Sequence, residues 1–264
     1  MKKRLDVFLY EHEYTISREK ANALIMSGLV YVNGEKATKS GLSVTEDCVI
    51  EIHESKNNYV SRGGLKLEKA IKTFGIKLKG FIAADIGAST GGFTDCMLSF
   101  GATKVYSVDV GYGQLAWELR NNEKVVVLER TNARYLTEKE IPEPLDFASM
   151  DVSFISITLI LPSLVKLLKD NGEIVCLIKP QFEAGRENVG KNGVVRDKNV
   201  HIKVINKIID FANAEKLSVR GFTYSPIKGP KGNIEYLILL KKCNEDTIHI
   251  DIEQVVTEAH TELE

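Results

Sequence analysis

The sequence predicts an α/β protein in which a mostly parallel, doubly wound sheet is preceded by a small α+β unit. From residue 81 onward, short apolar runs alternate with helical patterns, which is typical of a parallel sheet covered by helices on both faces. Residues 1–55 instead show two helical patterns followed by short strands. A polar stretch then indicates a linker at residues 56–60. We therefore expect domains at 1–55 and 61–264.

The first unit is expected to begin with a helix over RLDVFLYEHE, residues 4–13. Ser17 is a predicted N-cap for a second helix, which follows helical apolar spacing and ends at Gly28. The segment VYVNGEKA, residues 30–37, predicts a strand that enters an Asn-Gly turn. Its successor VTEDCVIEIHE, residues 44–54, alternates as one continuous strand would.

The second unit opens with a Gly-Gly turn and a helix that ends near residue 76. Beyond it, strand patterns cover residues 81–87, 104–111, 125–130, 145–154, 173–182, 218–227 and 234–242. Helical patterns cover residues 93–101, 114–122, 157–172, 201–217 and 246–263. Most strands are separated by one helix, as in a doubly wound fold.

Composition limits the classes of function. Hydrophobic residues make up 44% of the 264 residues and charged residues 27%, as in an ordinary globular protein. The net charge of -1 provides no overall basic field, so nucleic-acid binding must use a local patch. Neither a signal peptide nor a run of ~18 apolar residues is evident. The four cysteines lack a metal-ligand or disulfide spacing, so we expect a cytoplasmic protein without a metal.

The stretch DIGASTGGFTDC, residues 85–96, follows an apolar strand, and its glycines would let the backbone approach a ligand closely. A triphosphate loop needs a lysine after its glycines, which this stretch lacks. A dinucleotide loop needs GxGxxG rather than the GxxxGG present here. S-adenosylmethionine needs room for its methionine part but no phosphate cradle, and is favoured. The alternative is a loop that only packs against its own sheet.

A second acid supports S-adenosylmethionine. Asp109 ends the next strand, where a carboxylate can accept hydrogen bonds from both ribose hydroxyls. Asn132 follows a further strand and is expected to reach the adenine edge, while Asp85 can face the cationic end of the ligand. The predicted cofactor-binding residues are Asp85, Gly87, Ala88, Ser89, Gly91, Gly92, Phe93, Asp109, Asn132 and Asp151.

Four charged residues stand beside apolar segments or at their ends: Lys66, Asp151, Lys179 and Glu235. Asp151 and Lys179 close consecutive strands at their carboxyl ends, where open α/β sheets bind ligands. A lysine held among two carboxylates and a second lysine could act as the general base for methyl transfer to a hydroxyl. The alternative is a set of ordinary surface ion pairs, or lysines that extend to water.

Several motifs resemble a known family. YVSRGGLKL, DIGASTGGFTDC, VDVGYGQL, MDVSFIS, IKPQFE and KGNIEYL, in this order, resemble the TlyA family of bacterial ribosomal-RNA 2′-O-methyltransferases, also known as haemolysin A. The second unit is similar to the Rossmann-like FtsJ/RrmJ-type methyltransferases. This resemblance implies S-adenosylmethionine and a catalytic Lys-Asp-Lys-Glu tetrad, which falls on Lys66, Asp151, Lys179 and Glu235. It also implies cytidine targets in large-subunit and, for chains with both terminal extensions, small-subunit ribosomal RNA.

The first unit resembles the alpha-L RNA-binding domain of the ribosomal protein S-four type, through RLDVFL and SREKANALIMSGLVYVNG. Residues 1–58 hold eight basic and nine acidic side chains, so the basic ones must gather on one face to meet RNA phosphates. The residues expected to contact RNA are Lys2, Lys3, Arg4, Arg18, Lys20, Lys36, Lys39, Arg62, Arg134 and Arg186.

Other functions fit less well. Base-amine methylases carry an Asn/Asp-Pro-Pro-aromatic motif where this chain has Asp151-Val152-Ser153-Phe154. Cytosine-carbon methylases need a nucleophilic cysteine, whereas Cys176 lies inside an apolar strand. A membrane-active haemolysin would need an amphipathic or spanning segment, which is not evident. A non-catalytic RNA-binding assembly factor would leave the charged tetrad unexplained.

Overall fold

The computed structural model describes residues 2–15, 17–26, 28–52 and 59–263. The chain divides into two compact units, Met1–Asn58 and Tyr59–Glu264, which are described separately. Residues 56–58 of the linker predicted at 56–60 lie outside the described residues. No helix among the described residues is long and apolar enough to cross a membrane.

The first unit packs two helices, α1 (Leu5–Glu11) and α2 (Arg18–Met26), against short antiparallel strands. β1 (Lys3–Arg4) pairs with β4 (Ser43–Val44), and β2 (Val30–Val32) lies between β3 (Glu35–Lys36) and β5 (Ile50–Ile52). The predicted N-cap is confirmed, because the Ser17 hydroxyl accepts from the Lys20 amide at 3.2 Å. Asn33 and Gly34 both have positive φ, as a two-residue hairpin turn requires.

The continuous strand predicted over residues 44–54 is wrong. β4 and β5 are separate, because β4 pairs with β1 whereas β5 pairs with β2. Between them the chain turns, and the Cys48 amide donates to the Thr45 carbonyl at 3.1 Å. The alternating apolar residues of 44–54 therefore belong to two strands in two different sheets.

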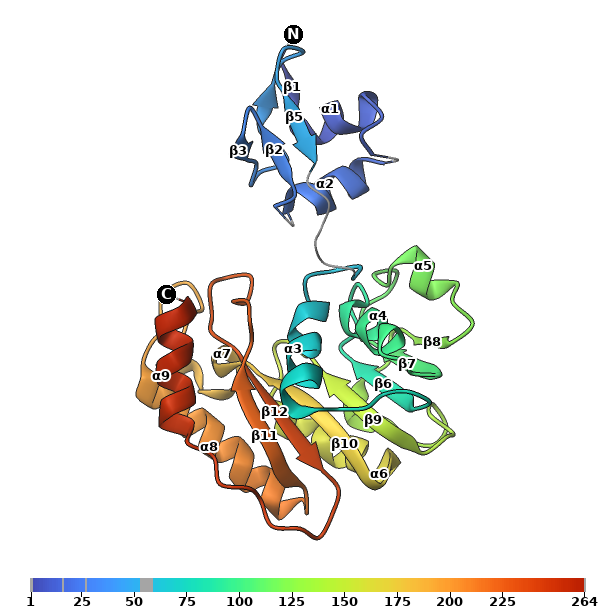
Figure 1. Ribbon diagram of the computed structural model, residues 1–264, viewed down its shortest axis with the longest axis vertical. Coiled ribbons are helices and arrows are strands. Elements are labelled where there is room, and N and C mark those ends of the chain that lie inside the picture. Colours follow the sequence, from blue (N-terminus) through green and yellow to red (C-terminus); the bar gives the residue numbers. More distant parts are fainter. Residues whose placement is uncertain (1, 16, 27, 53–58, 264) are drawn as a thin grey trace. The chain divides into compact units, whose positions relative to one another are not determined.

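The second unit contains the predicted doubly wound sheet, with strand order β11-β12-β10-β9-β6-β7-β8 (Figure 1). β10, β9, β6, β7 and β8 form parallel pairs, and β12 runs antiparallel to both β10 and β11, so six of the seven strands run in one direction. The strands are β6 (Ile82–Ile86), β7 (Lys104–Val108), β8 (Val125–Leu128), β9 (Leu145–Met150), β10 (Leu168–Ile178), β11 (Ser218–Tyr224) and β12 (Tyr236–Lys241). The helices are α3 (Gly64–Phe74), α4 (Gly92–Ser99), α5 (Trp117–Arg120), α6 (Leu161–Leu167), α7 (Pro180–Glu183), α8 (Lys198–Ala214) and α9 (Ile252–Leu263).

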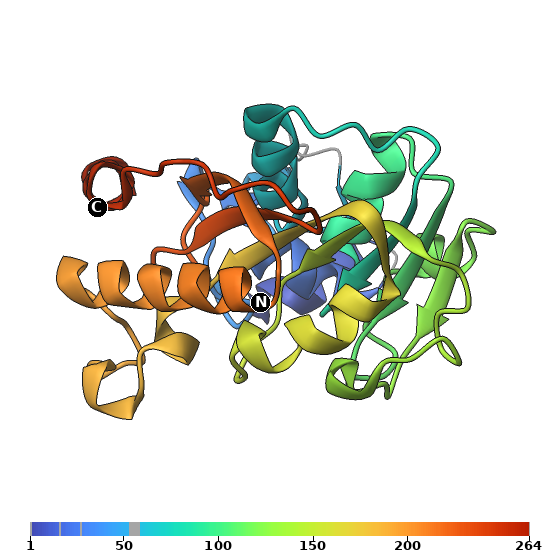
Figure 2. The ribbon, with the colours of Figure 1, turned by 90° about the horizontal axis from the view of Figure 1, so that it is seen from below.

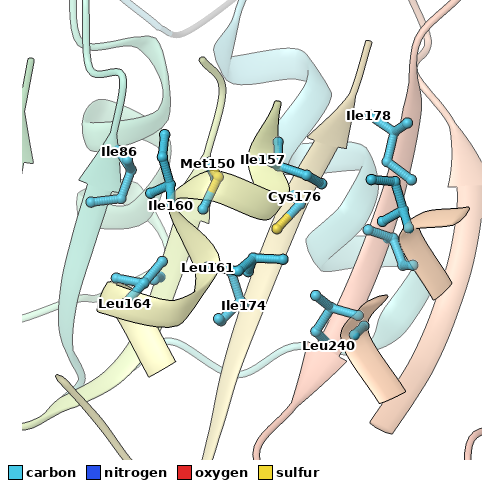
Figure 3. Packing of buried hydrophobic residues seen from close by; sticks show 14 of the residues in the cluster. Ile86, Met150, Ile157, Ile160, Leu161, Leu164, Ile174, Cys176, Ile178 and Leu240 are labelled. Atoms are coloured by element: carbon cyan, nitrogen blue, oxygen red, sulfur yellow. The ribbon is translucent and has the colours of Figure 1, made fainter. Parts of the chain in front are cut away.

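Helices cover both faces of this sheet (Figure 2). α3 and α4 pack on one face, where Leu67 and Met97 are fully buried. α6, α8 and α9 pack on the other, and Figure 3 shows side chains of β6, β9, β10 and β12 meeting those of α6 there. Cys176 belongs to this second cluster and is fully buried, which places its thiol in the core as expected.

Three predicted helices are clearly shorter than their patterns, and the last of them, expected over 246–263, begins only at Ile252. The pattern over 114–122 forms only the single turn α5, and that over 157–172 is divided between a 3₁₀ turn, α6 and the start of β10. In the second case Leu168 pairs with Leu145 of β9, so strand pairing replaces the last helical turn.

The strand order creates a switch point between β6 and β9. After β6 the chain continues outward to β7 and β8, and it then returns to β9 and β10 on the other side. Ligands of open α/β sheets bind at the carboxyl ends of strands beside such a reversal. The loops after β6 and β9 are therefore expected to form the functional site.

Asp6 offers a test of the first unit. Its side chain is 1% exposed, and hydrogen bonds from Arg4 and then Arg18 lower the pKa of its carboxyl to about 2. The stabilisation is therefore present above pH 3.8 and lost as the pH falls through about 2. We expect Asp6→Asn to lower the stability of this unit near neutral pH by roughly 1–2 kcal/mol, with little difference at low pH. Hydrogen exchange of the α1 amides in the full chain measures this, with Glu35→Gln as the exposed control; equal losses in both variants would contradict the assignment.

Candidate functional site

The glycine loop after β6 depends on close backbone approach. Gly87 and Gly91 have φ values of +85° and +95°, where side chains are strained. A Cβ atom on Gly87 would lie 2.5 Å from the carbonyl oxygen of Asp151. The loop after β6 and the loop after β9 thus touch through their backbones, and only glycine permits that contact.

The expectation that Asp85 faces the ligand is not met. Its side chain is fully buried; one oxygen accepts from the Thr94 amide and hydroxyl at 2.8 and 2.7 Å, and the other from Ser149 at 3.3 Å. Because side chains alternate along a strand, Asp85 of β6 points toward the face covered by α4. It anchors the first turn of that helix instead of lining the site.

Asp109 lies at the carboxyl end of β7, next to the glycine loop. Its carboxylate accepts from the amides of Ser89 at 2.8 Å and Gly111 at 2.7 Å. Its own carbonyl accepts from the Thr131 amide at 2.9 Å, which brings the segment of Asn132 to the same edge. Asn132 is exposed, and its side chain caps a short turn by accepting from the Arg134 amide.

The four charged residues predicted to act together form one chain of ion pairs. Lys66 of α3 binds Glu235 at 2.6 Å and lies 3.8 Å from Asp151. Lys179 binds the other oxygen of Asp151 at 2.5 Å. Lys66, Lys179 and Glu235 are buried, so the alternative of ordinary surface ion pairs is wrong. Two positive and two negative groups balance one another, as charges away from water require.

A single pocket joins this charged chain to the glycine loop. It has a volume of about 400 Å³, within the range of small-molecule sites. The residues that line it are Ser61, Arg62, Gly63, Lys66, Gly87, Ala88, Ser89, Thr90, Gly92, Phe93, Asp151, Ser153, Lys179, Pro230 and Glu235. Asp85, Gly91, Asp109 and Asn132, which were also expected to bind the cofactor, are not among them.

Residues 59–242 match the family model of FtsJ-like methyltransferases, and residues 3–50 match that of the S4 domain. The chain belongs to the FtsJ-like methyltransferases. The predicted family and the S-four type of the first unit are thereby confirmed.

Relatives of this methyltransferase match along almost the whole chain. "Putative rRNA methyltransferase YqxC" of Bacillus subtilis is 49% identical over 99% of this chain and 95% of its own. "16S/23S rRNA (cytidine-2'-O)-methyltransferase TlyA" of Mycobacterium tuberculosis is 40% identical over 93% of this chain and 96% of its own. A solved structure described as "Putative hemolysin from Streptococcus thermophilus" has a TM-score of 0.80 and 46% identity, over 99% of this chain and 96% of its own.

The pocket of this methyltransferase fits S-adenosylmethionine, the cofactor of its family. Gly87, Ala88 and Ser89 line the pocket with small side chains, which leaves room for the methionine part of the ligand. Asp109 is half-buried at the neighbouring strand end and would hold the ribose hydroxyls. When bound, the cofactor supplies an electrophilic methyl group, and the charged chain lies across the same pocket.

Two residues that sequence reasoning did not select also belong to the site. Ser153 accepts a hydrogen bond from Lys179 at 3.1 Å, so it fixes the ammonium group beside Asp151. Phe154 is 89% exposed, has a positive φ of 65° and packs against Phe182 with ring centroids 5.0 Å apart. An exposed aromatic ring on strained backbone beside a site indicates a ligand-contacting role. The signal was present in the sequence, because both residues lie within three positions of Asp151.

The basic residues expected to contact RNA are only partly available. In the first unit, Arg4 and Arg18 come together on Asp6, whereas Lys3 is paired with Glu11 and Glu46. The other lysines of that unit that were expected to contact RNA are exposed: Lys2, Lys20, Lys36 and Lys39. In the methyltransferase unit, Arg62 lines the pocket, and Arg134 and Arg186 are exposed.

Asp85→Asn tests the placement of Asp85. Burial raises the pKa of the Asp85 carboxyl to about 7, against the opposing hydrogen bonds from Thr94. The bound proton therefore stabilises the fold below pH 3.8, and this contribution is lost as the pH rises through about 7. We expect Asp85→Asn to be more stable than the parent by about 1–3 kcal/mol near pH ~8, and equally stable near pH ~4. Urea unfolding at both pH values measures this.

The same variant separates anchoring of α4 from cofactor contact. S-adenosylmethionine affinity, measured by calorimetry, is expected to stay within about threefold of the parent. A loss of more than about tenfold would show that the Asp85 charge acts on the cofactor after all.

Proposed function

We propose that this protein transfers a methyl group from S-adenosylmethionine to the 2′-hydroxyl of cytidine in ribosomal RNA, in the large subunit and also in the small one. The main support for this proposal is the chain of ion pairs among Lys66, Glu235, Asp151 and Lys179, which lies in the same pocket as the glycine loop. The substrate class follows from the relative in Mycobacterium tuberculosis, whose name specifies 16S and 23S ribosomal RNA and the cytidine 2′-oxygen.

Lys179 is the general base of the proposed reaction. Methyl transfer forms a carbon–oxygen bond at the 2′-oxygen and breaks the carbon–sulfur bond of the cofactor. The hydroxyl proton passes to the lone pair of the unprotonated amine of Lys179, and Asp151 neutralises the ammonium group that results. Asp151 and Ser153 hold Nζ at 2.5 and 3.1 Å, so the acceptor is oriented before the hydroxyl arrives. Lys66 and Glu235 neutralise each other and keep the second oxygen of Asp151 near a positive charge.

A target nucleotide within folded RNA must leave its base stack before its 2′-hydroxyl can enter a pocket of this kind. The exposed Phe154 ring packs against Phe182 with centroids 5.0 Å apart, and Lys179 Nζ lies 5.9 Å from the centre of the Phe182 ring. Aromatic rings stack on exposed bases without requiring a particular sequence. We therefore assign Phe154 to holding the displaced base, and the S4 domain and surrounding basic residues to holding the RNA that carries it. Work on ribosomal RNA would place the protein in the cytoplasm.

Lys179→Ala tests this assignment. Loss of the base should lower methyl transfer by about 10²–10⁴-fold, while S-adenosylmethionine affinity stays nearly unchanged because Lys179 neighbours the acceptor. Labelled methyl transfer from S-adenosylmethionine to isolated bacterial ribosomal subunits measures the reaction, and mapping of the modified nucleotides identifies its targets. Lys77→Ala, an exposed change at the amino ends of the strands, is the control and should keep full activity.

Unchanged transfer by Lys179→Ala would remove the base assignment. Label at a base rather than a ribose, or no label on either subunit, would contradict the proposed function. Lysis of red cells by the purified protein, equal in the parent and Lys179→Ala, would instead favour the membrane-active reading that the name of the Streptococcus thermophilus structure suggests.

A further inference from the structure

Two loops beside the pocket are tied together by one buried amide. Asn233 is 2% exposed and precedes Glu235 by two residues. Its side chain accepts from the Val195 amide at 3.0 Å and donates to the Gly193 carbonyl at 2.9 Å. Its own carbonyl accepts from the Gly229 amide at 2.8 Å. The segment 185–198, which follows α7, is thereby held against the β11–β12 connection, residues 225–235.

These two loops are rich in basic residues, although the net charge of the whole chain is only -1. Their basic residues, called the basic rim below, are Arg186, Lys191, Arg196, Lys198, Lys228 and Lys231. Within residues 185–198 and 225–235 the acids are Glu187, Asp197 and Glu235. The Asp197 side chain caps α8 by accepting from the Asn199 amide, and Glu235 is paired with Lys66. Among residues 59–263, no carboxylate lies within ion-pair distance of a basic-rim residue.

The charges of the two loops share one surface. The Lys231 ammonium lies 3.6 Å from where a Cβ atom of Gly193 would be, so it sits over the turn of the other loop. Lys191 and Arg196 line a hollow of about 350 Å³ in that loop. Pro230, next to Lys231, lines the pocket of the charged tetrad. Lys231 of the basic rim is therefore next to a residue of the pocket, whereas Lys191 and Arg196 line a separate hollow.

We propose that the basic rim binds backbone phosphates of the RNA strand that flanks the target nucleotide. This inference rests on the proposed function and adds a second RNA-binding surface to that of the S4 domain. Exposed and uncompensated lysines and arginines are the groups that neutralise phosphates. An anionic membrane fits less well, because the valines of the loop, Val189, Val194 and Val195, are buried or half-buried and offer no apolar face for insertion.

The test is the paired charge reversal Lys191→Glu/Lys231→Glu. Its control is Lys77→Glu/Lys124→Glu, with the same charge change on exposed lysines at the amino ends of β6 and β8. We expect the rim variant to raise KM for ribosomal subunits at least about fivefold, with nearly unchanged kcat and S-adenosylmethionine affinity. The slope of log Kd against log salt for a ribosomal-RNA transcript should fall by about 2. The neutral pair Lys191→Gln/Lys231→Gln should lower that slope similarly with a smaller rise in KM.

The proposal is overturned if the rim variants match the control in both KM and salt slope. It is also overturned if they lose binding to phosphatidylglycerol vesicles while RNA binding stays unchanged. The measurement of RNA affinity does not depend on methyl transfer. A failure of the rim proposal can therefore be distinguished from a failure of the proposed function. A parent protein that transfers no methyl group contradicts the proposed function, and the rim is then still judged from the salt slope.

Discussion

The carboxylate of Asp151 lies between the ammonium groups of Lys66 and Lys179. The arrangement of the methyltransferase unit depends on keeping these three charged groups together. A buried lysine without a partner costs several kcal/mol, so Lys66 and Lys179 need carboxylates that cannot drift away. Asp151 directly follows β9, Lys179 directly follows the neighbouring β10, and Glu235 directly precedes β12. The register of the sheet therefore sets the distances among Asp151, Lys179 and Glu235. Lys66 belongs to α3, so its position depends instead on how α3 packs against the sheet.

The glycine loop and the charged chain form one mechanical unit. Gly87 touches the carbonyl of Asp151, so a shift of the cofactor loop would be transmitted to the carboxylate that orients Lys179. Asp85 stabilises the same loop from beneath, through the first turn of α4. Its buried carboxyl accepts hydrogen bonds from Thr94 and Ser149, so the acid in front of the glycines supports the loop.

In the proposed mode of RNA binding, the contacts are distributed over separate basic patches. In the S4 domain the charges of Arg4 and Arg18 are partly used to neutralise Asp6, and Lys3 is paired with acids. A net charge of -1 for the chain limits long-range attraction to a polyanion. Under this proposal, the uncompensated charges on the loops next to the tetrad would contact RNA where the ribose must be aligned, without making the whole protein basic.

The amino-acid pattern by itself determined the alternation of strands and helices, the buried face of α3 and the glycine loop, because these depend on local periodicity and backbone freedom. It also indicated the four charged residues, since charges beside apolar segments are conspicuous. Only the tertiary structure decided that residues 44–54 serve two sheets and that Asp85 points away from the pocket. It also decided how Lys66 and Glu235, 169 positions apart, become partners. β12 runs antiparallel to β10, so its first residues, and not its last, lie at the edge where β10 ends; strand direction is a property of pairing and is not written in the strand itself.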